Sequence, residues 1–360
     1  MANAQLSPQA RAMNFGYYTR QHIQTLGAMT GTAGSHLEFE VPKARLLQAI
    51  NLEVEYTLKA KKEGESINIY TGDDLNKKLA LYDVLKRISI NFNNGFQNMT
   101  ASGKEFAILN MLRVKSDTII PAGYEHEGKM CYFGIGDGET ASELTVNFML
   151  EIPITLNDRD PAGLVLAQNA TTLINGQIDI ANDLAIKSLE NAYIDSVIIK
   201  PQIVSFSIPD MPEAFPDLTV LKIVDSRKSG FNAGGSNVIS IPTGQIYRKI
   251  IIKLEDEEGN PILPEDITSN FELIFNGADT PYAISPRALR FRSVTQTGGC
   301  MPEGYYVFDF SCQGTNPNYG GSRDYVDSEQ LTVFEARFTC RKAGKVTIIS
   351  EKISRLKASN

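Results

Sequence analysis

The sequence predicts an all-β protein made of two β-sandwiches in tandem, with one helix before the first sandwich. The first observation is the period of the apolar residues, which alternate with polar ones from Leu37 onward, as in strands with one buried face. The second is the stretch SIPDMPEAFPD at residues 207–217, whose three prolines divide the strands into two series. The third is a similarity between residues 39–56 and residues 239–256.

The first element is a helix predicted from residue 8 to about residue 26. Ser7 is a favourable N-cap, and Pro8 stands at the first helical position, where proline is tolerated best. Apolar residues then recur at roughly helical spacing until Gly27. This apolar face needs a partner. It can pack against the protein or a neighbouring molecule, or it can lie on a membrane surface.

Two series of strands follow, each strand bounded by Gly, Asn, Asp or Pro. The first series is predicted at residues 37–41, 50–58, 86–92, 142–156, 176–180 and 195–208, and the second at 218–224, 237–241, 247–256, 271–276, 304–310, 330–340 and 345–353. Short helical patterns occur only at residues 73–87 and 182–192. Residues 115–143 and 311–330 are rich in turn residues, so we expect exposed loops there.

The similar segments read FEVPKARLLQAINLEVEY at residues 39–56 and ISIPTGQIYRKIIIKLED at residues 239–256. Only Pro42/Pro242, Ile50/Ile250 and Glu55/Glu255 are identical. What repeats is a proline after a short strand, a polar bend and an alternating strand. Two explanations remain open at this point, an internal duplication and a chance similarity between two β-stretches.

The charge is unevenly distributed along the chain. The net charge is −7, which argues against a chain-wide nucleic-acid binder. Residues 1–36 contain two arginines and no acidic residue, whereas residues 341–360 contain six basic residues and one glutamate. Both ends are therefore basic, and the negative charge lies in residues 37–340.

The cysteines and the chain start suggest a protein made in a reducing compartment. Cys131, Cys300, Cys312 and Cys340 show no CxxC spacing, so free thiols are the first expectation. A disulfide between Cys300 and Cys312 is the alternative. The segment MANAQLSPQARAM lacks the apolar core of a signal peptide, and the chain has no run of 18 apolar residues.

A search for catalytic residues gives negative results. His22, His36 and His126 are far apart in sequence and have no clustered metal ligand or nucleophile, which disfavours a cupin or a hydrolase. GIGDG at residues 134–138 lacks the strand–helix context of a dinucleotide loop. The acidic runs at residues 157–160 and 255–258 are predicted to be solvated turns. We expect no catalytic residue, no metal and no cofactor, and a structural or binding role.

Four stretches carry a resemblance to a known family: MANAQLSPQARAM, NDRDPAGLVLAQN, IYRKIIIKLEDEEGNPI and MPEGYYVFDFSCQ. With these the chain resembles the double jelly-roll major capsid proteins of tectivirus-like bacteriophages, which are tailless and contain an internal membrane. The resemblance spans most of the chain in order. The chain departs from the pattern in having no Trp and different loop lengths, which leaves strand boundaries open.

The resemblance implies two tandem eight-stranded jelly rolls with an N-terminal helix. The expected parts are an N-terminal arm at residues 1–36, a first jelly roll at 37–208 and a second, with a basic tail, at 209–360. Three chains would form a pseudo-hexagonal homotrimer that tiles an icosahedral shell around an internal membrane. The implied partners are other trimers, penton and minor capsid proteins and the membrane surface, without direct nucleic-acid contact. The chain would be made in the host cytoplasm and reside in the virion.

The basic ends then predict the inward face of the shell. In the family both termini lie at the base facing the membrane, so we expect the ends of this chain to contact membrane or lattice neighbours. The residues expected there are Arg11, Arg20, Lys352, Arg355 and Lys357.

Two other functions remain as alternatives. One is a minor vertex or receptor-binding virion protein, which would be shorter if it were a single jelly roll. The other is a glycan-active enzyme built on paired jelly rolls, for which a signal peptide and an aromatic, acidic cleft are the expected features.

Overall fold

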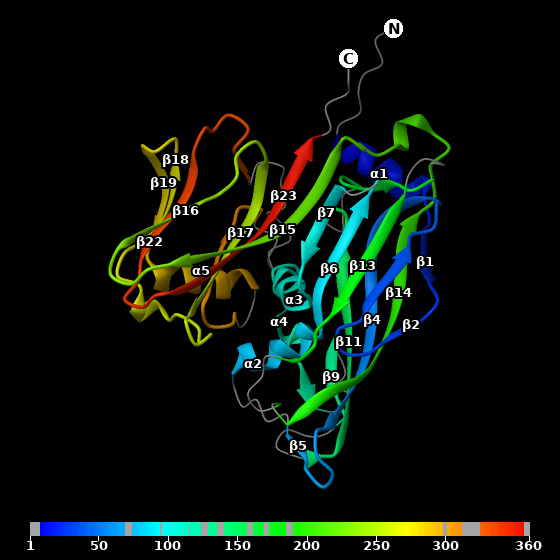
Figure 1. The fold of residues 1–360 in the computed structure, drawn as a ribbon. Coiled ribbons are helices and arrows are strands. Elements are labelled where there is room, and N and C mark those ends of the chain that lie inside the picture. The colour runs from blue at the N-terminus through cyan, green and yellow to red at the C-terminus, as the bar shows by residue number, and fades with distance from the viewer. Residues whose placement is uncertain are drawn as a thin grey trace.

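The computed structural model describes residues 8–68, 74–93, 96–114, 116–123, 129–134, 140–156, 161–168, 173–184, 189, 191–297, 301–311 and 325–355. The chain forms two β-sandwich units side by side (Figure 1). The first unit extends to residue 206 and the second begins at residue 220. Residues 207–219 connect them and contain the short helix η3 (Pro212–Ala214).

Two facing sheets make up the first unit. Its strands are β1 (Gln21–Thr25), β2 (Met29–Gly31), β3 (His36–Glu40), β4 (Leu46–Ala60), β5 (Ile67–Asn68), β6 (Leu85–Phe92), β7 (Phe96–Ala101), β8 (Ala122–Gly123), β9 (Cys131–Phe133), β10 (Thr140–Ala141), β11 (Glu143–Pro153), β12 (Val165–Leu166), β13 (Ile174–Ile180) and β14 (Ala192–Phe206). One sheet has the order β1-β14-β4-β11-β9-β8, and the facing sheet has the order β7-β6-β13-β3. The pair β5–β10 forms a separate ribbon, while β2 and β12 add to the first sheet.

The second unit also contains two sheets. Its strands are β15 (Val220–Phe231), β16 (Ser236–Ser240), β17 (Ile246–Asp256), β18 (Phe271–Phe275), β19 (Asp279–Ile284), β20 (Tyr305–Asp309), β21 (Val326–Asp327), β22 (Phe334–Thr339) and β23 (Gly344–Arg355). The sheet orders are β15-β23-β17-β20 and β16-β22-β18-β19, and β21 pairs with β17. The short helix η4 (Pro264–Asp266) precedes β18.

The two units have the same topology. In chain order, β1, β3, β4, β6, β7, β11, β13 and β14 correspond to β15, β16, β17, β18, β19, β20, β22 and β23. The order β1-β14-β4-β11 then becomes β15-β23-β17-β20, and β3-β13-β6-β7 becomes β16-β22-β18-β19. Both units therefore share the same eight-stranded sandwich, with the same strand order, and the further strands are additions to it.

The repeated sequence stretch falls on equivalent strands. Adding 200 to the bounds of β3, residues 36–40, gives those of β16, residues 236–240, and the starts of β4 and β17 differ by 200 as well. Val41 donates its backbone N–H to the first residue of β13 at 2.9 Å, and Ile241 donates to the first residue of β22 at 2.8 Å. This shared geometry supports an internal duplication over a chance similarity.

Helices cover the ends of the sandwiches. They are α1 (Pro8–Tyr18), α2 (Leu75–Leu79), η1 (Ala80–Val84), α3 (Gly103–Met111), α4 (Ser116–Ile119) and α5 (Pro286–Thr297). The sequence patterns did not predict α3 or α5. The sequence does contain a signal for α3, because Ser102 and Glu105 form a capping box at its start. The Oγ of Ser102 accepts a hydrogen bond from the backbone N–H of Glu105, and the carboxylate of Glu105 accepts one from the backbone N–H of Ser102. Every residue of α3 is buried, which hides its period from pattern analysis.

The predicted first helix is too long at its C-terminal end. It stops at Tyr18, and Gln21–Thr25 form β1 instead. β1 pairs in antiparallel register with the end of β14, from Gln21 opposite Phe206 to Thr25 opposite Gln202. An exposed strand edge offers a full row of backbone partners, and this tertiary pairing outweighs a weak helical period. The predicted arm at residues 1–36 thus contributes strands to the first unit.

Two other local predictions need correction. Residues 73–87 were predicted as one helix, but α2 and η1 end at Val84 and β6 begins at Leu85. Residues 115–143 were predicted as a loop, but they contain α4, β8 and β9, and β9 pairs with β11. The middle of the helical pattern at 182–192 and most of the loop at 311–330 lie outside the described residues.

The units share apolar packing. The core of the first unit includes residues from the outer face of the second unit's β15-β23-β17-β20 sheet, namely Val224, Ile251, Tyr305, Val307 and Ile349. The core of the second unit is a separate cluster on the other face of the same sheet. A parallel bridge between Val224 and Met99 also links β15 to β7. The two sandwiches are therefore packed together through buried apolar surface.

Candidate functional site

The two described histidines, His22 and His36, do not form a catalytic or metal-binding group. His22 lies on β1, and His126 lies outside the described residues. His36, on the exposed face of β3, has Asp179 Oδ1 2.5 Å from Nδ1 and Glu38 Oε1 3.0 Å from Nε2. The hydrogen bonds to these carboxylates raise the pKa of His36. Within the described part of the chain, no group of three or more His, Cys, Asp or Glu side chains could hold a metal ion.

The cysteines and acidic runs are structural where they are described. Cys131 and Cys340 are buried free thiols, and burial raises the pKa of each, which makes them poor nucleophiles. Cys300, Cys312 and residues 157–160 lie outside the described residues. In the run at 255–258, Asp256 accepts two hydrogen bonds from Asn260, which fixes a turn.

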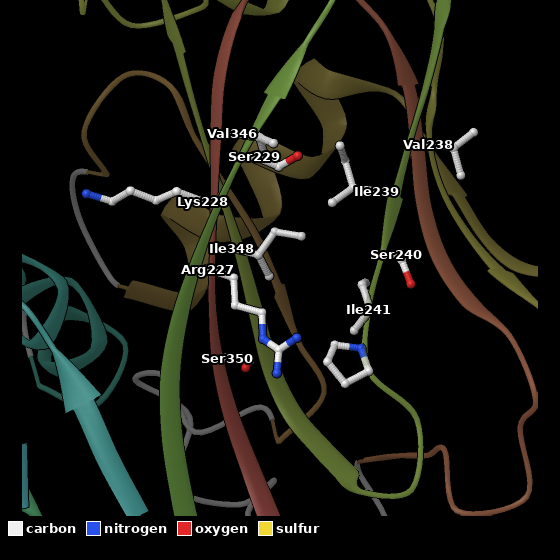
Figure 2. A pocket seen from close by; sticks show the side chains of 11 residues that line it. Arg227, Lys228, Ser229, Val238, Ile239, Ser240, Ile241, Val346, Ile348 and Ser350 are labelled. Carbon is white, nitrogen blue, oxygen red and sulfur yellow. The ribbon is translucent and has the colours of Figure 1, made fainter. Parts of the chain in front are cut away.

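A cavity of about 240 Å³ opens between β15 and β16 at one flank of the second unit. Figure 2 shows Ile239, Ile241 and Ile348 directed toward its centre, with Arg227 and Lys228 on β15 at its side. Its polar lining consists of these two cations and serine hydroxyls, without a carboxylate or histidine that could act as a base. This flank is therefore an apolar recess between two edge strands.

A second cavity of about 410 Å³ lies between the two units and is lined by charged residues, including Asp83, Lys104 and Lys253. Desolvation raises the pKa of Asp83 and lowers the pKa of Lys104. The neighbouring charges already have structural roles. Lys104 Nζ donates to the carbonyl of Asn76 at 3.1 Å, and Lys253 Nζ lies 2.7 Å from a carboxylate oxygen of Glu255.

The two ends of the described chain lie at one end of the molecule, which we call the terminal face. It is formed by α1, the 207–219 connection and the last residues of β23 (Figure 1). Phe15 anchors α1, because its ring packs edge-on against Phe206 at 5.1 Å. Met13 and Tyr17 point outward, 64% and 81% exposed. The helix thus has one side seated on the protein and an apolar side in solvent.

Several of the basic residues predicted for an assembly surface belong to the terminal face. Arg11 and Arg355 both act on Asp217: the hydrogen bonds from Thr219, together with these two positive charges, hold the pKa of that carboxyl below its usual value. Arg20 is exposed next to α1, and its backbone exchanges hydrogen bonds with Ser207. No helix among the described residues is long and apolar enough to cross a membrane.

The assignment of Lys352 to this surface is wrong. Lys352 is 2% exposed, and its Nζ lies 2.6 Å from a carboxylate oxygen of Asp225 on the neighbouring strand β15. Desolvation lowers the pKa of Lys352, although Asp225 opposes this effect. The position is buried because the β15-β23-β17-β20 sheet is covered on both faces. Lys357 lies outside the described residues.

A buried charge cluster joins the two units, and the sequence patterns did not single it out. Glu351 on β23 lies 3.3 Å from Lys222, 3.1 Å from Arg248 and 3.0 Å from Lys249. All four side chains are at most 8% exposed. Lys222 and Arg248 also donate to the backbone carbonyls of Thr155 and Leu156 in the first unit, at 3.4 and 3.3 Å. The sequence does contain a signal for buried charges, because charged residues stand inside apolar strands, as in IYRKIIIKLED and KVTIISEKI.

Burial and charge act against each other in this cluster. Burial alone would raise the pKa of Glu351, but the three cations outweigh it and hold that pKa far below its usual value. Burial lowers the pKa of Lys222 to about 8, in spite of Glu351. The carboxylate therefore stays ionised at neutral pH and neutralises cations that the fold has removed from water.

No family model matches the sequence, and no curated protein matches it. Solved structures do match over nearly the whole chain. The crystal structure of the MCP of STIV, Sulfolobus Turreted Icosahedral Virus, has a TM-score of 0.68 and 14% identity, covering 93% of this chain and 97% of that chain. This chain has the double jelly-roll fold.

Two further double jelly rolls are similar. The PBCV-1 virus capsid has a TM-score of 0.61 and 10% identity, with 95% of this chain and 96% of that chain covered. The major capsid protein of bacteriophage PM2 has a TM-score of 0.53 and 12% identity, with 95% and 100% covered. At these identities the likeness establishes the fold, and the predicted fold class is confirmed.

Proposed function

We propose that this chain is a major capsid protein, a structural protein that forms pseudo-hexagonal homotrimers and tiles an icosahedral shell around an internal membrane. One observation carries the proposal: two jelly rolls with identical strand order are packed together through buried apolar surface in one chain. Three such chains contain six similar units, so a three-fold ring would have a nearly hexagonal outline suited to a flat lattice. The likeness to viral capsid structures over the whole chain supports this assignment.

The first test is the oligomeric state. We expect the purified chain to be a trimer of about three times 39.7 kDa in light scattering at micromolar concentration. Obligate ring interfaces should keep this mass constant on tenfold dilution. A chain that stays monomeric at micromolar concentration would contradict the capsid proposal.

Copy number in purified particles separates the alternatives. A major capsid protein is the most abundant protein of the shell, a vertex or receptor-binding protein is present at the vertices alone, and a glycan-active enzyme need not be in the particle. The proposed partners are neighbouring trimers, penton and minor capsid proteins and the membrane surface. The proposed place is the virion shell, after synthesis in the host cytoplasm.

The terminal face is proposed to be the inward side of the shell. It carries Arg11, Arg20 and Arg355, together with the exposed apolar side chains of Met13 and Tyr17. Each basic residue close to an anionic membrane surface is worth about 1 kcal/mol, and the attraction decays over a Debye length. Three copies per trimer, repeated over a facet, would hold a shell near a membrane without a spanning segment.

This orientation predicts weaker membrane binding after charge reversal. We expect the double variant Arg11→Glu/Arg355→Glu to bind anionic phospholipid vesicles at least about tenfold more weakly than the unmodified chain at low salt. The difference should shrink as salt rises, because the attraction is electrostatic. Vesicle co-sedimentation over a salt series measures it.

The matched control reverses two exposed lysines at the other end of the molecule. Lys62 follows the end of β4, away from the terminal face, and Lys77 lies on α2. The variant Lys62→Glu/Lys77→Glu has the same net charge as the test variant and should keep most of the vesicle binding. Equal losses in both variants would mean that the terminal face is not the membrane side.

A further inference from the structure

The helices α3 and α5 occupy equivalent places in the two jelly rolls. α3 lies between β7 and β11, and α5 lies between the corresponding strands β19 and β20. Both begin after a serine whose Oγ accepts a hydrogen bond from the backbone N–H three residues later: Ser102 from Glu105 at 3.2 Å, and Ser285 from Ala288 at 3.3 Å. Counted from these serines, Leu109 and Arg292 both stand at the seventh position.

Inside the chain, α3 forms the contact between the two jelly rolls. Phe106 and Leu109 of α3 belong to the same apolar cluster as Val224, on the outer face of the β15-β23-β17-β20 sheet, and line one small cavity with it. Glu105 accepts a hydrogen bond from Ser226 of the same strand at 2.8 Å. The helix at the edge of one sandwich therefore packs on the outer sheet face of the next, and the contact is directional.

Part of the equivalent surface of α5 is uncovered. Ala288, Phe291, Arg292 and Thr295 recur at helical spacing and are all exposed, and Phe291 is 73% exposed. The opposite side of α5 is seated, because Leu289 and Ser293 are buried. Counted from Ser285, the counterparts of Glu105 and Leu109 are Ala288 and Arg292, which are exposed, whereas Leu289, the counterpart of Phe106, is buried. Phe291 lies beside Arg292 on the exposed side and adds a large aromatic surface there.

The first jelly roll has the matching sheet face, also uncovered. In the strand register of the second roll, Val224 of β15 lies opposite Glu351 of β23, and Glu351 lies opposite Lys249 of β17. In the register of the first roll, Ile23 of β1 lies opposite Val204 of β14, and Val204 lies opposite Ala49 of β4. Since β1, β14 and β4 correspond to β15, β23 and β17, Ile23 is the counterpart of Val224. Val224 is 2% exposed beneath α3, whereas Ile23 is 64% exposed.

The charges of the two uncovered surfaces are complementary. The outer face of the β1-β14-β4-β11 sheet carries five carboxylates, Glu53, Glu55, Glu143, Glu151 and Asp195, against Lys59, Lys200 and Arg113, which pairs with Glu151. The exposed side of α5 carries Arg287 and Arg292. Within the described part of the chain, neither Arg292 nor Glu55 has an ion-pair partner.

We infer that α5 of one chain docks on the outer face of the β1-β14-β4-β11 sheet of a second copy, with Phe291 covering Ile23. This repeats between chains the contact that α3 makes within the chain. In Figure 1, α3 lies between the two jelly rolls, α5 lies in the second, and the β4–β14 sheet lies on the far side of the first. The interface is head-to-tail, so it can close a ring. The inference rests on the proposed function and names the residues that build the trimer.

The test uses two full-length single variants, Phe291→Asp and Ile23→Asp, each of which damages one of the two surfaces. We expect each alone to be monomeric in sedimentation velocity at a concentration where the unmodified chain is trimeric, with affinity lowered about hundredfold or more. An equimolar mixture should form heterodimers and no trimer, because each pair then retains a single intact interface. The control Val238→Asp, at an exposed valine on β16, should remain trimeric.

The outcomes are distinct. If both single variants remain trimeric, the inference is overturned while the capsid proposal stands. If one variant alone loses the trimer, or if the mixture stays monomeric, the interface is not this head-to-tail contact. If the unmodified chain is itself monomeric, the proposed function fails first. Unchanged circular dichroism and cooperative unfolding of the monomers are the control that both substitutions, at exposed positions, leave the fold intact.

Discussion

The variant Glu351→Gln should lower the free energy of unfolding by about 3–5 kcal/mol, because it removes a buried carboxylate that forms ion pairs with three buried cations. A neutral amide keeps the shape of the side chain but takes away the negative charge that lies within 3.3 Å of Lys222, Arg248 and Lys249, in a site from which water is excluded. Guanidinium unfolding at one fixed protein concentration measures the effect. A loss below about 1 kcal/mol would show that the cluster is not a stabilising contact between the jelly rolls.

Two further measurements separate this effect from a general loss of a surface charge. The variant Glu65→Gln removes an exposed ion pair with Lys62 at 3.6 Å and should change stability by less than about 0.5 kcal/mol.

The pH dependence of the stabilisation by Glu351 has a defined sign. The pKa of Glu351 is far below its usual value in the folded chain, so its stabilisation is complete above about pH 4.5 and is lost as pH falls. The difference in the free energy of unfolding between Glu351→Gln and the unmodified chain should therefore become smaller at acidic pH.

The variant Phe106→Ala should lower the free energy of unfolding by a similar amount, about 3–5 kcal/mol. Phe106 is 2% exposed and packs between α3 and the second jelly roll, next to Val224. Truncation removes the buried ring and leaves a cavity in a contact that two rigid sandwiches hold open, so the site can collapse only in part. Chemical unfolding measures the loss.

The control for this prediction is Val238→Ala. Val238 is an apolar residue on β16 that is 46% exposed, so its truncation should change the free energy of unfolding by less than about 0.5 kcal/mol. Equal effects of Phe106→Ala and Val238→Ala would mean that the packing of α3 against the second jelly roll contributes little to stability. The two variants thus compare a contact between the rolls with an exposed position in one of them.

Much of the fold follows from local pattern. The predicted strands of both series occur, and the repeated stretch lies on β3–β4 and β16–β17 with a constant offset of 200 residues. Alternation of side chains is a property of the strand itself, so it can be read without a structure. The helices α3 and α5 were missed for different reasons. α3 is buried on all sides, and α5 has an exposed aromatic residue where an amphipathic period would have a polar one.

The candidate surfaces were only partly predictable. Basic ends could be counted in the sequence, and Arg11 and Arg355 do lie near the same carboxylate, Asp217. Lys352 was misplaced, because its strand is covered on both faces and a charged residue there is buried beside Asp225. The position of Lys352 inside the apolar stretch KVTIISEKI was a local sign of burial, which a count of basic residues at the chain end does not take into account.

The sequence by itself determined that the chain is an all-β protein with two series of strands, since strand period and turn residues are local properties, whereas the repeated stretch left duplication and chance open. Only the tertiary structure decided which sheet faces are covered. Val224 and Ile23 occupy equivalent strand positions, yet one is buried beneath α3 and the other lies in solvent. That difference depends on which jelly roll packs against which, and such packing joins residues more than a hundred positions apart, as between Glu105 and Ser226.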